Sequence, residues 1–170
     1  MDPVAPHLTE GLEQAMVAES DGYHFYMMAA ENTSDEQGKS AFRALAQEEL
    51  DHLQFLKTQY QALISTGKPD ENARLGHRAE FSGASPIFST ALMSRVKEAH
   101  YEMSALSIAI GLELSAVQHY GKLAQESADA TVKAFFAELS DWESGHYEAL
   151  LRQQETLKDD YWAAGGFSPL

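Results

Sequence analysis

The feature of this chain that most restricts its fold is a pattern of residues that occurs twice. Each copy consists of a Glu, a Tyr seven residues later, and a Glu-x-x-His motif that begins thirty residues after the first Glu. The first copy is formed by Glu19, Tyr26, Glu49 and His52, and the second, 94 positions later, by Glu113, Tyr120, Glu143 and His146. Carboxylate and imidazole groups repeated in fixed register are typical ligands of hard and intermediate metal ions.

The same offset relates residues that have no ligand chemistry. These pairs are Leu12 and Leu106, Ala15 and Ala109, Ala30 and Ala124, Asp35 and Asp129, Lys39 and Lys133, Phe42 and Phe136, Leu45 and Leu139, Leu56 and Leu150, and Gln59 and Gln153. Because apolar positions match as well, the repeat is one of structure and not only of a motif. We interpret the chain as two copies of one helical hairpin, each supplying three candidate ligands.

Apolar residues recur at spacings of three, four and seven, which is the period of an amphipathic helix. This pattern predicts four helices, over residues 8–32, 36–65, 88–127 and 130–158. The turn and N-cap residues Asn32-Thr33-Ser34-Asp35 separate the first two helices. The third helix is expected to break before Tyr101, and the aromatic segment 159–170 is expected to be a tail.

Residues 66–86 are rich in Gly, Pro, Asn, Arg and Ser and have no period, which indicates a connector. A helix of about 30 residues is about 45 Å long, and about 20 extended residues reach about 65 Å. The connector can therefore return along the whole bundle and let the third helix run parallel to the second. The predicted fold is a single all-α domain over 1–170, a four-helix bundle of two repeated hairpins with a long crossover between helices 2 and 3.

The composition narrows the functions that such a bundle can have. With 170 residues, 44% of them hydrophobic, the chain has the size of one globular domain. A net charge of −14 argues against a nucleic-acid or anionic-membrane surface. Without a recognisable signal peptide or a run of about 18 apolar residues, we expect a cytoplasmic protein. With no cysteine, the chain can hold neither a disulfide nor an iron–sulfur cluster, so electrons must come from an external donor.

The repeated glutamates and histidines interrupt otherwise apolar helix faces. A spacing of three places both side chains of each Glu-x-x-His motif on one face, so all six groups should converge in the core. Each buried ion left unpaired costs several kcal/mol. Either protonation or two divalent cations would relieve this cost, and the cations also explain the symmetry. Tyr26 and Tyr120 lie two turns from Glu19 and Glu113, where they either hold the ligand carboxylates or pack in the core.

The ligand pattern resembles that of the ferritin-like superfamily, and most closely the diiron domain of rubrerythrins. The motif of that domain is met here by Glu19, Glu49-Leu-Asp-His52, Glu113 and Glu143-Ser-Gly-His146. The resemblance covers about residues 8–158 and implies a ferritin-like bundle that holds two iron ions. It implies that Glu49 and Glu143 bridge the irons, that Glu19 and His52 complete one iron, and that Glu113 and His146 complete the other.

Two departures from the rubrerythrin pattern matter. Rubrerythrins carry a further Glu three residues after the third-helix ligand, where this chain has Ala116. The iron shift that accompanies peroxide reduction in that family uses this Glu, so that part of the mechanism is not carried over. Rubrerythrins also have a rubredoxin domain whose iron is held by four cysteines. We interpret the chain as a rubredoxin-less relative with a ligand set closer to that of bacterioferritins.

The resemblance implies a non-haem diiron oxidoreductase that reduces hydrogen peroxide or dioxygen, with an external rubredoxin-like electron donor and no catalytic residue beyond the ligands. One alternative is a ferroxidase or iron-handling protein, although a storage cage usually needs a fifth helix. A second alternative is a metal-free structural or interaction bundle. A manganese or mixed-metal site, manganese catalase activity and substrate hydroxylation use the same ligand types and stay open. By resemblance we expect a homodimer, and the long connector would permit a helix-swapped one.

Overall fold

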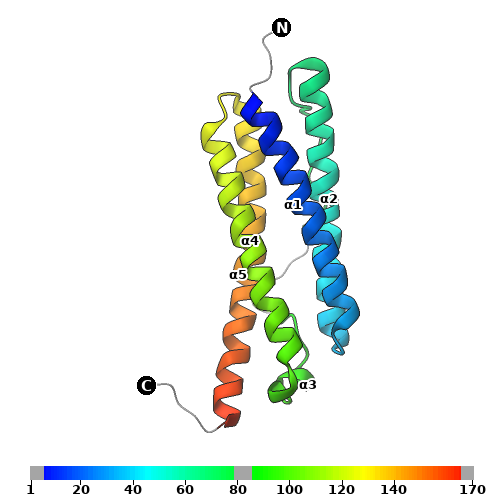
Figure 1. Ribbon diagram of the computed structural model, residues 1–170, viewed down its shortest axis with the longest axis vertical. Helices are drawn as coiled ribbons and strands as arrows, with labels where there is room; N and C mark the ends of the chain where they lie inside the picture. Colours follow the sequence, from blue (N-terminus) through cyan, green and yellow to red (C-terminus); the bar gives the residue numbers. More distant parts are fainter. Residues whose placement is uncertain (1–5, 79–85, 166–170) are drawn as a thin grey trace.

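The computed structural model describes residues 6–78 and 86–165, and every regular element within those ranges is helical. The long helices are α1 (Pro6–Asn32), α2 (Glu36–Thr66), α4 (His100–Glu126) and α5 (Ala130–Gly165), and the short ones are α3 (Thr90–Met93) and the 3-10 helix η1 (Val96–Glu98). Figure 1 shows two antiparallel hairpins, α1 with α2 and α4 with α5, in which α4 runs parallel to α2. The predicted all-α, ferritin-like four-helix bundle is confirmed. None of the described helices is both long and apolar enough to cross a membrane.

Aspartate residues at the same repeat position begin α2 and α5. The Asp35 carboxylate accepts a hydrogen bond from the Gly38 backbone N–H at 2.9 Å and so caps the N-terminus of α2. Before α5, the Asp129 carboxylate accepts from the Val132 N–H at 3.0 Å. Such a cap contributes about 1 kcal/mol. Asp35 also accepts from the backbone N–H of Ser89 at 3.0 Å, which ties the end of the crossover to the start of α2.

Two repeated glutamines hold the two ends of the crossover. The side chain of Gln59 exchanges a pair of hydrogen bonds with the backbone of Asp70, each 2.9 Å long. The side-chain oxygen of Gln153 accepts from the backbone N–H groups of Ile87 and Phe88, at 2.7 and 3.3 Å. Both glutamines are buried. The crossover is therefore anchored to each hairpin at an equivalent position of the repeat.

The structure confirms one detail of the second hairpin and corrects another. The break expected before Tyr101 is present, because α3 and η1 precede α4, which begins at His100. The prediction that the last helix ends at residue 158 is wrong, because α5 continues to Gly165. Residues 159–164 contain neither Pro nor Gly, so nothing stops the helix before the Gly165-Gly166 pair. The rest of the expected tail, residues 166–170, lies outside the described residues.

The apolar core consists of two clusters, one on each side of a central polar layer. One cluster includes Tyr26, Phe42, Leu106 and Leu150, and the other includes Leu12, Leu56, Tyr120, Phe136 and Leu139. The aromatic pairs repeat: Tyr26 stacks on Phe42 with ring centroids 6.2 Å apart, and Tyr120 stacks on Phe136 at 6.1 Å. The candidate ligands lie between these clusters along each helix, so apolar packing holds the polar layer from both ends.

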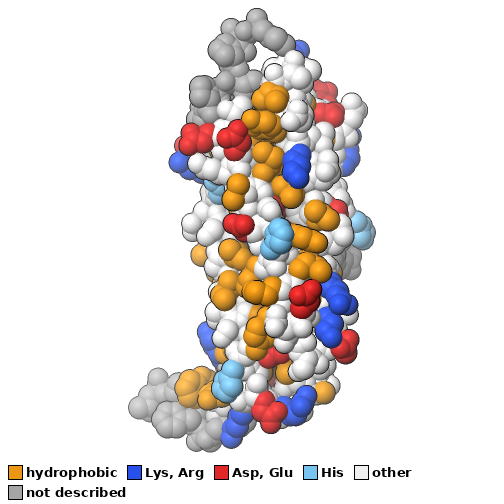
Figure 2. All heavy atoms as spheres, turned by 45° about the vertical axis from the view of Figure 1, so that its right-hand side comes forward, with side chains coloured by type: hydrophobic (Ala, Val, Ile, Leu, Met, Phe, Trp, Pro, Cys, Tyr) orange, Lys and Arg blue, Asp and Glu red, His pale blue; other side chains and the backbone are white. Residues whose placement is uncertain are grey.

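Apolar side chains also reach the surface of the bundle. Figure 2 shows them spread lengthwise along one face, with charged groups and histidines between them. The large exposed apolar side chains on the four long helices include Val17, Met28, Ile64, Ile108, Leu112 and Leu114. Single exposed apolar residues are ordinary on soluble proteins, but Ile108 and Leu112 lie one turn apart on the same face of α4.

Candidate metal centre

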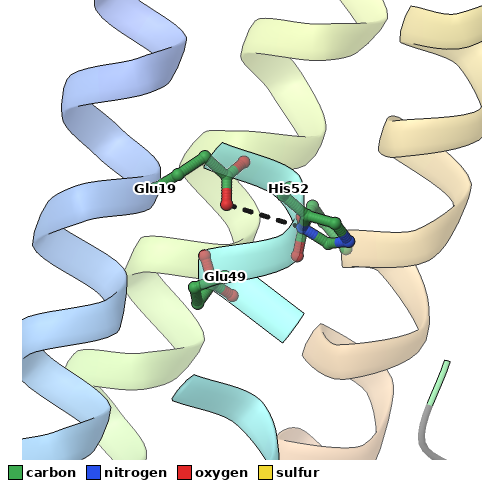
Figure 3. A group of neighbouring side chains, drawn as sticks. Glu19, Glu49 and His52 are labelled. Atoms are coloured by element: carbon green, nitrogen blue, oxygen red, sulfur yellow. Dashed lines mark ion pairs between the residues drawn. The ribbon is translucent and has the colours of Figure 1, made fainter. Parts of the chain in front are cut away.

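The six candidate ligands come from all four long helices. Glu19 lies on α1, Glu49 and His52 on α2, Glu113 on α4, and Glu143 and His146 on α5. Each is buried, with at most 6% of its surface exposed. Figure 3 shows Glu19 reaching from α1 toward His52 on α2, with Glu49 one turn away. The sequence repeat therefore places six ionisable groups in the middle of the bundle, where the structure brings them together.

The ligand atoms form two groups of four that share two residues. The first group is Glu19, Glu49, His52 and Glu143, and the second is Glu49, Glu113, Glu143 and His146, with ligand atoms within 4.8 Å of one another in each group. His52 Nδ1 lies 2.8 Å from one oxygen of Glu143, and His146 Nδ1 lies 3.0 Å from the other. The shared residues are those that the resemblance to rubrerythrins assigns as bridging ligands. Metal binding by these residues stays a prediction.

The chemistry of this donor set fits divalent metal ions. Several buried polar atoms lack a well-formed hydrogen bond within the described chain, and these are Glu19 Oε2, Glu49 Oε1, His52 Nδ1, His52 Nε2 and Glu143 Oε1. A buried carboxylate oxygen without a partner is costly. Two divalent cations would be formally neutralised by four carboxylates and would give each unpaired oxygen a partner. Carboxylate and imidazole ligands together suit iron, manganese and zinc.

The ionisable side chains of the cluster shift one another's pKa values strongly. Burial and the nearby Glu143 charge raise the pKa of Glu113 to about 8, and burial and the Glu19 carboxylate raise the pKa of Glu49. Burial acts to lower the pKa of His52, but the Glu143 and Glu19 carboxylates outweigh it and raise this pKa to about 10. Glu49, His52 and Glu113 thus hold protons at neutral pH, and a divalent cation that binds there must displace them.

The two repeated tyrosines connect the hairpins crosswise. The Tyr26 hydroxyl donates a hydrogen bond to Glu113, and the Tyr120 hydroxyl donates to Glu19. Each tyrosine therefore holds a carboxylate of the other hairpin rather than the one on its own helix. Burial and then the charge of its partner raise the pKa of each hydroxyl well above its usual value. Both hydroxyls keep their protons at neutral pH and remain donors.

Sequence reasoning missed two buried residues beside the cluster, Glu48 and Trp142. Glu48 is 2% exposed, and its carboxylate lies 3.0 Å from His146 Nε2. The indole N–H of Trp142 donates to the same carboxylate oxygen. The sequence does contain a signal for these residues. The position immediately before the Glu of each Glu-x-x-His motif differs between the two copies, being Glu48 in the first and Trp142 in the second.

A cavity leads from the surface to the cluster between α1 and α4. Its volume is about 380 Å³, and its lining includes Gln14, Ala18, Glu19, Glu49, Glu113 and Ala116. Ala116 is the position where rubrerythrins carry a further Glu, and here its small side chain lines the approach to the ligands. A molecule the size of peroxide or dioxygen can therefore reach the carboxylates from this side.

Gly22 also lies beside the site. A Cβ atom built on Gly22 would come within 2.8 Å of Glu49 Oε2, so the missing side chain leaves room for this candidate bridging carboxylate. Other histidines lie away from the ligands. His24 is exposed and its Nδ1 contacts the Ser20 carbonyl oxygen at 2.6 Å, while His119 contacts the Gly11 carbonyl oxygen at 3.1 Å.

The fold and the site define a ferritin-like helical bundle with a buried carboxylate and histidine cluster that could hold metal ions. A family model described as Rubrerythrin matches residues 10–154, and the chain belongs to the rubrerythrin family. A solved structure of a hypothetical protein from Pyrococcus furiosus is similar, with a TM-score of 0.65, 26% sequence identity, and coverage of 89% of this chain and 90% of that one. Among proteins of curated function, no match is found.

Proposed function

We propose that this protein is a non-haem diiron oxidoreductase that reduces hydrogen peroxide, or dioxygen, with electrons from an external donor. The observation that carries the proposal is the pair of interlocking ligand groups that share Glu49 and Glu143. A site for one ion would need only one of these groups. Two groups in contact through bridging carboxylates are the arrangement that a two-electron reaction on a small oxidant needs.

In this proposal Glu19 and His52 would hold one iron, Glu113 and His146 would hold the other, and Glu49 and Glu143 would serve both, since they belong to both groups. Two ferrous ions bound there would supply the two electrons that reduce the O–O bond of a peroxide. Other residues of the chain orient the ligands and keep the site dry. Tyr26 and Tyr120 fix the outer carboxylates from opposite hairpins, and the two apolar clusters exclude bulk water on either side.

The approach to the site favours a small oxidant. The cavity beside Ala116 is lined by Glu19, Glu49 and Glu113, whereas His52 and His146 do not line it. A Glu in place of Ala116 would fill part of this space with another carboxylate. The cavity therefore supports an open approach for the oxidant on the side of α1 and α4.

The test is to load the metal-free protein anaerobically with ferrous iron and to follow the near-UV absorbance of the oxidised product. Samples are mixed with peroxide or with dioxygen, and bound iron is counted. Two irons per chain and much faster oxidation by peroxide are the expected result. Oxidation by dioxygen at an equal or higher rate would favour a ferroxidase, and iron bound well beyond two per chain would favour iron handling. No bound iron and no absorbance would contradict the diiron assignment.

Two Glu→Gln variants compare the loss of a carboxylate at the candidate site with the loss of one at the surface. Glu49→Gln removes a shared carboxylate without changing its size, and we expect it to abolish both iron binding and the absorbance change. Glu138→Gln alters an exposed glutamate of α5 and should leave both unchanged. If neither protein bound iron and Glu49→Gln kept the stability of the parent protein, a metal-free structural bundle would be the better assignment.

We further propose that the protein works with partners. The electron donor is a separate rubredoxin-like protein, since the 170 residues contain no cysteine, and a cytoplasmic location would suit such a donor. Self-association as a homodimer is supported by the exposed apolar residues Ile108 and Leu112, which share one face of α4. Light scattering of Leu112→Glu compared with the parent protein tests the dimer, and an unchanged mass would exclude this face.

A further inference from the structure

The strongest difference between the two hairpins lies next to the candidate ligands. Glu48 precedes Glu49 on α2, whereas Trp142 precedes Glu143 at the equivalent position on α5. Both side chains are buried, with 2% and 7% of their surfaces exposed. They face each other across the bundle, because the Trp142 indole N–H donates a hydrogen bond to Glu48. Two different residues thus bond each other at a position where an exact repeat would have the same residue twice. The two hairpins therefore differ next to the candidate metal centre.

His146 is held from both sides of its imidazole ring. Its Nδ1 atom faces the cluster, 3.0 Å from Glu143 and 3.7 Å from Glu113. Its Nε2 atom points away from the cluster and lies 3.0 Å from the Glu48 carboxylate. With Nδ1 bound to a cation, the proton of the ring resides on Nε2 and is donated to Glu48. A carboxylate behind a ligating histidine fixes the tautomer and orientation of the ring and increases its basicity.

His52 has a different environment. Its Nδ1 atom also faces the cluster, 2.8 Å from Glu143 and 3.5 Å from Glu19. Its Nε2 atom is buried and has no hydrogen-bond partner in the described part of the chain. The Trp142 ring packs against the imidazole in a T-shaped arrangement, with centroids 5.0 Å apart and planes at 88°. Because the indole N–H is directed to Glu48, Trp142 offers His52 an aromatic surface and no carboxylate.

From this arrangement we propose that the two metal positions are inequivalent and fill in order. The position formed by Glu49, Glu113, Glu143 and His146 binds a divalent metal ion more tightly than the position formed by Glu19, Glu49, His52 and Glu143. Glu48 is the positioning residue that produces the difference, and Trp142 orients its carboxylate. The inference rests on the proposed function in one respect, namely that these ligands bind metal.

The unequal support has a chemical consequence for the proposed diiron site. A more basic histidine makes its metal ion a weaker Lewis acid and a better electron donor. The ion beside His146 would be filled first and would be the more reducing of the two. An ordered site also explains how one chain could bind two different divalent metals, with the less tightly bound one at His52.

Cobalt(II) is a suitable probe, because its visible spectrum and paramagnetic proton shifts report ligands without any turnover. We would titrate the metal-free protein with cobalt and record absorbance and proton NMR spectra. Two binding steps of one ion each are expected, with affinities that differ by about 10-fold or more. The first step should produce a shifted imidazole N–H signal that exchanges slowly with water, because Glu48 holds it. The second should produce one without this protection.

Glu48→Gln keeps the size of the side chain and removes its charge. We expect it to weaken binding at the His146 position by about 10- to 100-fold, to leave binding at the His52 position unchanged, and to speed exchange of the protected N–H. Trp142→Phe keeps the ring against His52 but loses the indole donor, and it should weaken binding at the His146 position by a smaller factor. Glu102→Gln is the matched control, since Glu102 is also buried but bonds Thr33 rather than a candidate ligand. It should leave both steps unchanged.

The outcomes separate the two proposals. Two equal binding steps in the parent protein, or equal weakening of both steps by Glu48→Gln, would overturn the inequivalence and leave the diiron assignment intact. Failure to bind cobalt or ferrous iron at all would overturn both. If Glu48→Gln does not fold, the N–H exchange rates of the parent protein and the Trp142→Phe titration still decide the question.

Discussion

The two hairpins supply the same ligands but surround them differently. The first contributes Gly22 and Glu48 beside the site, whereas the second contributes Ala116 and Trp142 at the equivalent positions. The residues that repeat in both hairpins form the core of the bundle and the cluster of candidate ligands. The unmatched residues decide what each half of the cluster can do, because they determine how closely a carboxylate packs and what lies behind each histidine.

The hairpins also depend on each other. Each repeated tyrosine bonds the glutamate of the opposite hairpin, and the shared Glu143 contacts histidines from α2 and α5. A single hairpin could therefore form neither ligand group. Repetition of this kind produces a site only when the two copies pack together, which places the candidate metal centre at the interface between them.

The largest expected effect is on metal content, when a candidate ligand that belongs to both groups is removed instead of one that belongs to a single group. Glu49→Gln should abolish binding of both metal ions, because Glu49 belongs to both groups of four. Glu113→Gln should abolish or weaken binding of only one ion, because Glu113 belongs to a single group. Elemental analysis after dialysis against ferrous iron would measure the metal content. Equal losses in both variants would contradict the division into two groups.

The pH dependence of stability should differ between the metal-free and the metal-bound protein. The folded-state pKa of His52 is about 10 and that of Glu113 about 8, each above its unfolded value. The folded metal-free chain thus binds more protons than the unfolded one, and this stabilisation is present at low pH and lost as pH rises toward 10. The metal-free protein should therefore lose stability steadily between pH 6 and 10.

Metal binding requires deprotonated ligands, so the metal-bound protein should gain stability relative to the metal-free form over the same range. Urea unfolding at several pH values, with and without ferrous or cobalt ions, would measure both trends. In the metal-free protein, His52→Gln should reduce the loss of stability between pH 6 and 10. The size of the reduction measures what the histidine of the first hairpin contributes to the pH dependence. A metal-free protein whose stability is flat between pH 6 and 10 would contradict these pKa shifts.

The crosswise tyrosines should be equivalent despite the different surroundings of the two hairpins. Tyr26→Phe and Tyr120→Phe each remove a buried hydrogen bond to a carboxylate, which contributes about 1.5–3 kcal/mol. We expect similar losses of stability in the two single variants, measured by chemical unfolding of the metal-free protein. Tyr60→Phe is a control, because the Tyr60 hydroxyl bonds the exposed Glu13 at 2.7 Å, and it should have a much smaller effect. Clearly unequal losses would show that the asymmetry extends to the tyrosines.

The sequence predicts the fold and the ligand cluster well because both rest on periodic patterns. Helical periodicity gives the four helices, and the offset between Glu19 and Glu113 identifies which polar residues on those faces belong together. The crosswise pairing of the tyrosines was not predictable in the same way. It depends on how one hairpin is rotated against the other, and spacing along a single helix contains no information about that rotation.

Two other features escaped prediction for different physical reasons. Glu48 and Trp142 were overlooked because a search for matches ignores the positions where the repeat fails. The end of α5 was placed too early because the apolar stripe ends near Leu157, although residues 159–164 include nothing that stops a helix.

The smallest expected effects come from exchanging the unmatched small residues between the hairpins. Gly22→Ala gives the first hairpin the residue that the second has at position 116. The added Cβ would lie 2.8 Å from Glu49 Oε2, so the carboxylate must move, and cobalt affinity should fall several-fold. The helix-propensity gain of about 1 kcal/mol offsets part of the strain, so the stability of the metal-free protein should change little. Gly111→Ala is the control, because its Cβ meets no atom within 4 Å, and it should stabilise α4 without altering cobalt binding. Equal cobalt affinities in the two variants would show that the space at Gly22 is not needed by the bridging carboxylate.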